Sequence, residues 1–187
     1  KNLISALSPS PPQEVLDAAN KLNYRDFITV GLEIDGTILN RKELSNLWIY
    51  IQDQNLNLGR IQIFNNWSPF LSRDPQKLLL GLEFFCTKGQ GLWEKSDDKI
   101  VNLALRELNF LNILKINKIH NSIVVKVPKA YPIYDEHYCN LKIIIKYLNN
   151  FNNLIPIGRN GLHRYNNMDH SMLTAMTAID KILKGEP

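Results

Sequence analysis

The chain has 187 residues, of which 44% are hydrophobic and 21% are charged, and its formal net charge is +4. This length is enough for a core that buries about 70% of the surface of the unfolded chain. No apolar run approaches the ~20 residues that a membrane-spanning helix needs. Lysine and arginine are scattered singly, so the mildly basic charge does not indicate a nucleic-acid-binding surface.

The first half of the chain predicts mainly strands. Lys1–Leu7 is an apolar run that predicts a buried strand, and residues 13–22 predict a short helix after the Ser/Pro break at 8–12. Further segments, separated by polar, Gly or Pro breaks, have the pattern of strands: Arg25–Ile34, Leu47–Ile51, Arg60–Phe64 and Leu78–Phe85. Short connections between neighbouring strands favour antiparallel pairing.

The second half alternates between helices and strands. Ser96 followed by two aspartates predicts the start of a helix that runs to about Leu108. The remaining elements are two strands, Lys118–Val127 (ended by Pro128) and Leu154–Ile157, and two helices, Tyr138–Leu148 and Ser171–Leu183 (ended at Gly185). We therefore expect an α+β fold with an antiparallel sheet of five to six strands and helices on one face.

The cysteine and histidine residues do not indicate a metal site. Cys86 and Cys139 lie far apart, and Cys86 is predicted to be a buried free thiol within an apolar run. His120, His137 and His163 are scattered and do not form a ligand set. This cysteine usage suits a reducing compartment, and we expect a cytoplasmic protein without a metal.

The most informative segment is the C-terminal run from Gly158 to His170. A short apolar strand is predicted to enter a loop with two glycines and Arg159, and this loop leads to the N-terminus of an amphipathic helix. Such an arrangement can present backbone N–H groups and a positive helix end to an anionic ligand. Arginine adds a bidentate donor for phosphate or carboxylate.

These residues resemble the C-terminal flavin-contacting segment of a flavoprotein superfamily, in which UDP-galactopyranose mutases, protoporphyrinogen oxidases, amine oxidases and carotenoid desaturases are found. The resemblance rests on the order Gly158-Arg159, then Arg164-Tyr165, then His170 opening the last helix. The chain departs from the mutase pattern by one extra residue before His170, and by Met168-Asp169 where mutases have Asp-Met. The resemblance implies an FAD-dependent oxidoreductase, in which the flavin performs the redox step.

The G-x-G-x-x-G fingerprint that holds most of the dinucleotide in that superfamily is absent from this sequence. The resemblance therefore implies a C-terminal fragment that is expected neither to retain FAD nor to be active by itself, although the full-length protein would be an enzyme. It implies three segments: 1–12 as strand and linker of the FAD domain, 13–152 as the substrate-binding α+β domain, and 153–187 as the flavin-contacting strand-loop-helix of a truncated FAD domain.

The resemblance also implies roles for single residues. Gly158 and Arg159 would contact the cofactor pyrophosphate or an anionic substrate group, and the helix start from Asn167, through Met168 and Asp169, to His170 would face the flavin. Tyr131, in a Tyr-Pro-Ile segment, and Tyr165 would contact the substrate. No acid partner that would orient His170 is visible from the spacing, and we assign no catalytic residue. We expect Tyr131, Arg159 and Tyr165 to lie together, and strand Leu154–Ile157 to lie beside strand Leu3–Leu7.

Two alternatives remain open at this stage. One is a flavin-dependent nucleotide-sugar mutase of the UDP-galactopyranose mutase type, and the other is a stand-alone binding module without enzyme activity. The expected partner is a small-molecule substrate, with neither nucleic acid nor a membrane span. The face left open by truncation is expected to expose apolar surface and to serve as a homo-oligomer contact.

Overall fold

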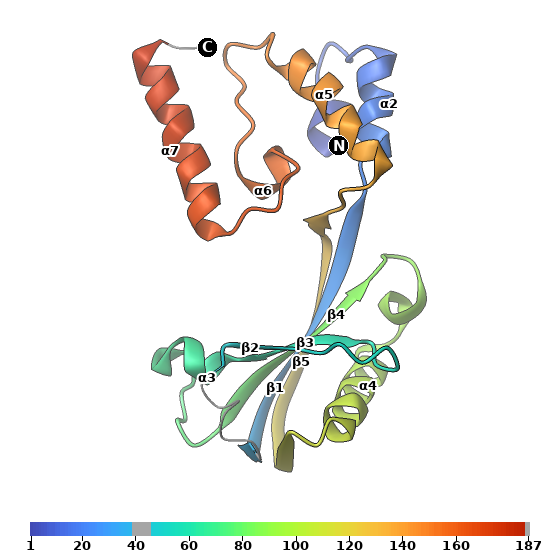
Figure 1. The fold of residues 1–187 in the computed structure, drawn as a ribbon, viewed down its shortest axis with the longest axis vertical. Helices are drawn as coiled ribbons and strands as arrows, with labels where there is room; N and C mark the ends of the chain where they lie inside the picture. Colours follow the sequence, from blue (N-terminus) through green and yellow to red (C-terminus); the bar gives the residue numbers. More distant parts are fainter. Residues whose placement is uncertain (39–45, 186–187) are drawn as a thin grey trace. The chain divides into compact units, whose positions relative to one another are not determined.

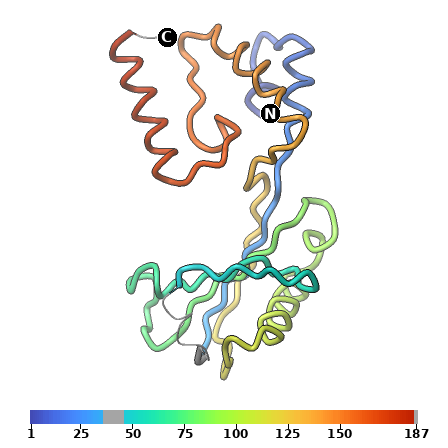
Figure 2. The backbone as a smooth tube through the Cα atoms, viewed as in Figure 1, coloured from blue at the N-terminus to red at the C-terminus, as the bar shows by residue number. Residues whose placement is uncertain are grey.

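The computed structural model describes residues 1–38 and 46–185, and it divides the chain into two compact units (Figure 1). The terminal unit comprises Lys1–Tyr24 and Tyr131–Pro187, and the sheet unit comprises Arg25–Ala130. Two long strands, β1 (Tyr24–Ile38) and β5 (Leu114–Pro132), run across the boundaries between the units. Both ends of the chain therefore belong to the same unit, as the backbone tube shows (Figure 2).

A five-stranded sheet forms the sheet unit, which confirms the predicted α+β class. Its strand order is β2-β3-β4-β1-β5. β2 (Trp48–Tyr50), β3 (Leu58–Ile63), β4 (Leu78–Cys86) and β1 pair antiparallel in that order. The short elements of this unit are α3 (Phe64–Trp67), η1 (Pro69–Leu71) and η2 (Gly91–Glu94).

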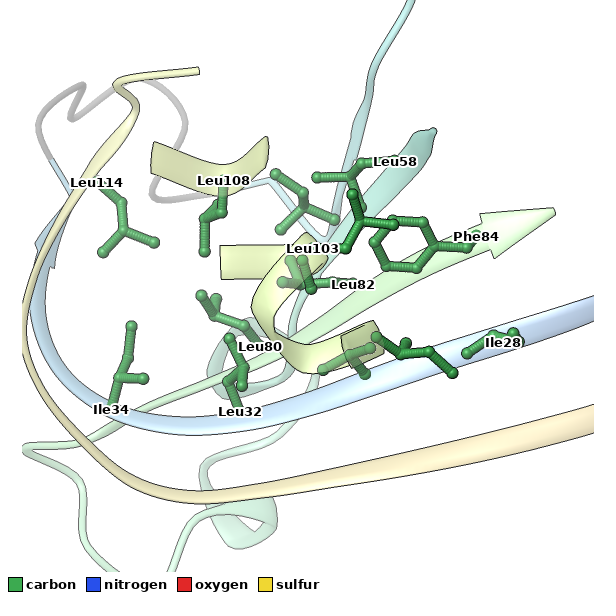
Figure 3. Close-up of a cluster of buried hydrophobic side chains, with 14 of the residues drawn as sticks. Ile28, Leu32, Ile34, Leu58, Leu80, Leu82, Phe84, Leu103, Leu108 and Leu114 are labelled. Atoms are coloured by element: carbon green, nitrogen blue, oxygen red, sulfur yellow. The ribbon is translucent and has the colours of Figure 1, made fainter. Parts of the chain in front are cut away.

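The core of the sheet unit lies between one face of the sheet and α4 (Asp97–Phe110). Alternate residues of β4 and β1 point to this face, and β4 contributes Leu80, Leu82 and Phe84. The helix buries Ile100, Leu103, Ala104 and Leu108 against them. Figure 3 shows Leu103 and Leu108 in this cluster with the three residues of β4. Apolar residues recur every second position on the strands and every three to four positions on the helix, so both elements present an apolar face. These two faces form one buried layer, whose burial stabilises this unit.

The opposite face of the sheet carries a buried ion pair. Register places Arg60 of β3 beside Glu83 of β4, and Arg60 Nε lies 2.5 Å from Glu83 Oε2. Gln62 donates its side-chain amide to the other carboxylate oxygen. The Arg60 guanidinium lies 4.6 Å from the centre of the Trp48 ring and 5.2 Å from that of Phe85. Burial is the largest influence on the Glu83 carboxyl and raises its pKa.

One strand end differs from prediction. We expected Pro128 to end the strand predicted to begin at Lys118, but β5 continues to Pro132. β5 is an edge strand, where a residue without an N–H does not remove a bond from the centre of the sheet. Beyond Pro128 the backbone is irregular, because Lys129 has a φ of 55° and its N–H donates to Asp26.

Helices dominate the terminal unit. They are α1 (Asn2–Ser5), α2 (Gln13–Lys21), η3 (Glu136–Asn140), α5 (Leu141–Leu148), α6 (Gly158–Gly161) and α7 (Met168–Lys184). A second apolar cluster joins α1, α2 and α5 through Ile4, Val15, Ala18, Ala19, Leu22, Ile144 and Leu148. Residues 13–24 and 131–152, which we expected in a substrate-binding domain, pack in this unit. The assignment of either unit to a flavin or substrate domain stays a prediction.

Two predicted strands of the terminal unit are wrong. Lys1–Leu7 contains the helix α1, and Leu154–Ile157 is neither strand nor helix. A short apolar run fits a buried helix as well as a strand, and a strand also needs a neighbour for its backbone groups. Leu154 nonetheless packs against the cluster that contains Ile4, so the two segments share one core without pairing as strands.

The last helix begins earlier than predicted. α7 starts at Met168, three residues before the predicted start at Ser171, and Asn167 is its N-cap. The predicted end is confirmed, because Gly185 has a φ of 67°. Most apolar side chains of α7 are exposed, including Met172, Met176, Ile179 and Leu183. In the ranges 1–38 and 46–185 no helix is both long and apolar enough to cross a membrane, and no three potential metal ligands lie together.

Candidate functional site

Three of the predicted site residues, Arg159, Tyr131 and Tyr165, lie in contact in the terminal unit. The two tyrosine rings stack with their centres 5.6 Å apart and their planes 13° from parallel. The Arg159 guanidinium carbon lies 4.4 Å from the centre of each ring. We call these three residues the arginine–tyrosine cluster. The expectation that they lie together is confirmed, although their roles stay predictions.

Local backbone structure fixes the position of Arg159. Gly158 has a φ of 70°, a conformation that favours glycine, and its N–H donates to Thr174 Oγ1 of α7 at 3.0 Å. A side chain at Gly161 would approach the Pro156 backbone to 3.4 Å. The two glycines therefore allow the chain to turn tightly into α6 beside α7, and this turn carries Arg159.

The Arg159 guanidinium is only partly satisfied. Its Nη1 donates to the backbone oxygen of Asn166 at 3.3 Å, whereas its Nε is buried without a hydrogen-bond partner. No carboxylate lies within ion-pair distance of it among residues 1–38 and 46–185. A guanidinium has five N–H donors, so this one keeps capacity for an anionic group.

The start of α7 holds the other predicted residues. Asn167 and Met168 are exposed, and the Asn167 side chain makes no capping bond. His170 Nδ1 lies 3.0 Å from Asp169 Oδ1, a contact that the sequence analysis did not identify. The pair is open to solvent, with side chains 60% and 77% exposed. A hydrogen bond from the His170 backbone is the main cause that lowers the pKa of the Asp169 carboxyl.

Two residues that the sequence analysis left without a role lie in the same unit as the cluster, and one of them, Tyr134, contacts it. The Tyr134 hydroxyl accepts a hydrogen bond from the Tyr165 backbone N–H, and so holds the position of that residue. Tyr134 also packs edge-on against Tyr138, with ring centres 4.7 Å apart. The signal in the sequence was the second aromatic residue of the segment Tyr131-Pro-Ile-Tyr134.

His163 is the other residue that the sequence analysis left without a role. It is 2% exposed, stacks on Tyr138 and meets Tyr24 edge-on at 4.7 Å. Within the described part of the chain, neither ring nitrogen has a hydrogen-bond partner. Burial is the main cause that lowers its pKa, so the ring is neutral in the folded chain at neutral pH. No sequence pattern predicts this contact, because Tyr24 is distant along the chain.

Comparison with known proteins shows that solved structures share the fold of this chain. No family model and no curated protein sequence matches the chain. Among solved structures, it is similar to a reduced UDP-galactopyranose mutase, with a TM-score of 0.76 and 21% identity over 90% of this chain and 35% of that one. It is also similar to a protein from Exiguobacterium sp. 255-15 described as a protoporphyrinogen oxidase, with a TM-score of 0.67 and 14% identity over 97% and 39% of the two chains.

These similarities confirm the resemblance inferred from the C-terminal motif at the level of fold. At such identities they show the fold alone. The chain spans just over a third of the length of each similar structure.

Proposed function

We propose that this chain supplies substrate-binding and flavin-capping elements of an FAD-dependent oxidoreductase of the amine oxidase and protoporphyrinogen oxidase-like type. The observation that carries the proposal is the arginine–tyrosine cluster, in which Arg159 is held against two rings without a carboxylate partner in the described ranges. Within the same ranges the Arg159 Nε is also buried without a hydrogen-bond partner, so the guanidinium keeps a donor for a bound ligand.

The residues present fit part of a flavin site. Arg159, with the backbone at Gly158, would contact a phosphate of the cofactor or an anionic substrate group. The first turn of α7, from Asn167 to His170, has N–H groups without intrahelical partners and a positive dipole end, which favour a nearby electron-rich ring edge. Tyr131 and Tyr165 would contact the substrate. FAD, when bound, supplies the redox chemistry.

Because one arginine and one helix end hold only a fraction of a dinucleotide, we expect the chain alone to bind FAD weakly. Titration of the chain with FAD, followed by flavin fluorescence, tests this. The proposal is supported if Arg159→Ala weakens the residual binding while Arg164→Ala, at an exposed arginine of the same loop, leaves it unchanged. Stoichiometric flavin retained through purification would contradict the expectation of weak binding, and equal loss in both variants would remove the special role of Arg159.

A nucleotide-sugar mutase is the second candidate function, favoured by the fold similarity to a UDP-galactopyranose mutase. Uridine diphosphate binding that depends on Arg159, Tyr131 and Tyr165 would support this candidate over the oxidoreductase. A chain that binds neither FAD nor uridine diphosphate would instead support a stand-alone module without enzyme activity.

For location and partners we propose a cytoplasmic protein that pairs with a second copy through α7. Met172, Met176, Ile179 and Leu183 are exposed and spaced by four, three and four residues, the pattern of a helix-pairing seam. In an antiparallel pair Asp169 at the start of one helix would face Lys184 at the end of the other. Met176→Glu should then lower the apparent mass in sedimentation experiments. If the wild type and the variant both sediment as monomers, the pairing is rejected.

A further inference from the structure

A cation-lined pocket lies on the exposed side of α4 in the sheet unit. Its volume is about 410 Å³, and its lining residues are Lys95, Lys99, Asn102, Leu103 and Arg106. The last four of these residues recur at three to four positions along α4, which brings them to one face of the helix. Lys95 lies just before the helix, at the end of η2. The sequence analysis described the basic residues as scattered singly, and helical spacing explains why that description missed the pocket.

The three cations of this pocket have no carboxylate within ion-pair distance in the described ranges of the chain. Glu107, which follows Arg106 in the helix, accepts bonds from the backbone N–H groups of Asn57 and Leu58, so it is engaged in holding the start of β3. Asp97 and Asp98 lie in the first turn but do not line the pocket.

A fourth cation adds to this charge. Lys126 of β5 donates through Nζ to the backbone oxygen of Lys95 at 3.0 Å and to that of Trp93 at 2.8 Å. Lys95, the residue that ends η2, and Lys99, in the first turn of α4, line the same pocket, so their like charges repel each other. An anion bound in the pocket would relieve this repulsion, whereas water relieves it only by screening.

We propose that this pocket binds the diphosphate group of a small molecule. Its volume lies within the range of small-molecule sites, which is about 300–1,000 Å³. A monovalent anion would leave two of the three lining cations uncompensated, and a diphosphate carries several negative charges on neighbouring oxygens. Arg106 offers paired N–H donors, the lysines act as point charges, and the Asn102 amide supplies a neutral donor. The inference does not depend on the function proposed for Arg159.

The test uses the full chain and inorganic pyrophosphate as the probe, followed by calorimetry and by NMR shifts of backbone amides. Wild-type protein should bind pyrophosphate saturably, with the largest shifts in residues 95–106. The double substitution Lys99→Gln and Arg106→Gln should weaken binding by about ten- to a hundredfold, the range for loss of charged hydrogen bonds. Both side chains are exposed and glutamine is a good helix former, so the fold should persist.

The matched control is Lys115→Gln with Lys118→Gln, which removes the same charge from two exposed lysines of β5 outside the pocket. This control should bind like wild type. Equal weakening in the two double variants, shifts spread over the whole surface, or no saturable binding would overturn the proposal. A nucleoside diphosphate that binds more tightly than pyrophosphate would assign the site to an organic ligand, and equal affinities would assign it to free polyphosphate.

Discussion

Arg60 and Arg159 both lie against aromatic rings, but they differ in whether a carboxylate neutralises the guanidinium. Arg60 in the sheet unit lies 4.6 Å from the centre of the Trp48 ring and is bonded to the buried Glu83. Arg159 in the terminal unit lies 4.4 Å from the centre of each tyrosine ring, but in the described ranges it has no acid within ion-pair distance. The first arrangement is complete within the chain, whereas the second has capacity for a ligand.

The physical distinction is how each charge is compensated. Arg60 is 8% exposed and Glu83 is 1% exposed, so each needs the other to offset the loss of water. Arg159 is partly exposed, which lets solvent screen its charge until an anion binds. Breaking the Arg60–Glu83 pair should therefore lower the stability of the fold, whereas removing the Arg159 side chain should mainly lower the affinity for a ligand.

The largest effect should follow from Glu83→Ala. This substitution leaves the Arg60 guanidinium buried without its acid, and breaking such a pair costs about 3–5 kcal/mol of unfolding free energy. Urea denaturation of the full chain measures this loss. Glu94→Ala, at an exposed acid of the same unit, should stay within about 0.5 kcal/mol of wild type. A loss below 1 kcal/mol for Glu83→Ala would show that water reaches the pair.

Arg159→Ala should instead have a small effect on stability and a larger effect on ligand affinity. The loss of its ring contacts should cost only about 0.5–1 kcal/mol of stability. Binding of the anionic ligand should weaken by about 1.5–3 kcal/mol, because a charged hydrogen bond is lost. Arg159→Lys should restore part of the affinity, since lysine keeps the charge but lacks the planar fork. Stability loss with unchanged ligand affinity would place Arg159 with Arg60 as a structural residue.

Of the two arginine sites, only the one around Arg159 was predicted from the sequence. Arg159 and Tyr165 lie in one short loop, so their proximity could be expected from the sequence. The contact with Tyr131 was expected only from the resemblance of its Tyr-Pro-Ile segment to the flavoprotein pattern. The Arg60–Glu83 pair was not predicted, since it depends on the register that sets β3 against β4. Periodicity was sufficient for β1, β4 and α4, whose apolar faces are long.

Short apolar segments were less informative. Lys1–Leu7 was interpreted as a strand but contains α1, because a few apolar residues can pack one face of a helix turn equally well. The buried environment of His163 could not be predicted, as it is assembled from Tyr24, Tyr138 and the loop before α7. Contacts between segments that are distant along the chain cannot be predicted from a single sequence.

His163 gives a pH-dependent test of the packing behind the cluster. Its pKa is lowered in the folded chain by burial, whereas it is about 6.5 in an unfolded chain. The unfolded state therefore binds the proton more readily, and stability should fall as the pH drops below about 6.5. Thermal unfolding at about pH 7.5 and about pH 5.5 should show this loss in wild type and a smaller loss in His163→Phe.

The exposed His170 provides the control for this measurement. His170→Gln should keep the wild-type loss of stability on acidification, because its side chain is 60% exposed and is not desolvated on folding. If His163→Phe lost as much stability as wild type between the two pH values, the acid sensitivity would arise from other groups. The unpartnered nitrogens of His163 would then be satisfied by water in solution.

The smallest effect should come from Tyr134→Phe, which removes the hydroxyl that accepts the Tyr165 N–H and keeps the ring. A neutral hydrogen bond contributes about 0.5–1.5 kcal/mol, and the loss should be near the lower value because Tyr134 is 55% exposed and water can replace the acceptor. The amide resonance of Tyr165 should shift, and affinity for the anionic ligand should fall less than in Arg159→Ala. Tyr147→Phe, whose ring packs against Phe151 elsewhere in the unit, should change neither quantity. An unchanged Tyr165 resonance in Tyr134→Phe would show that stacking on Tyr131 alone positions that ring.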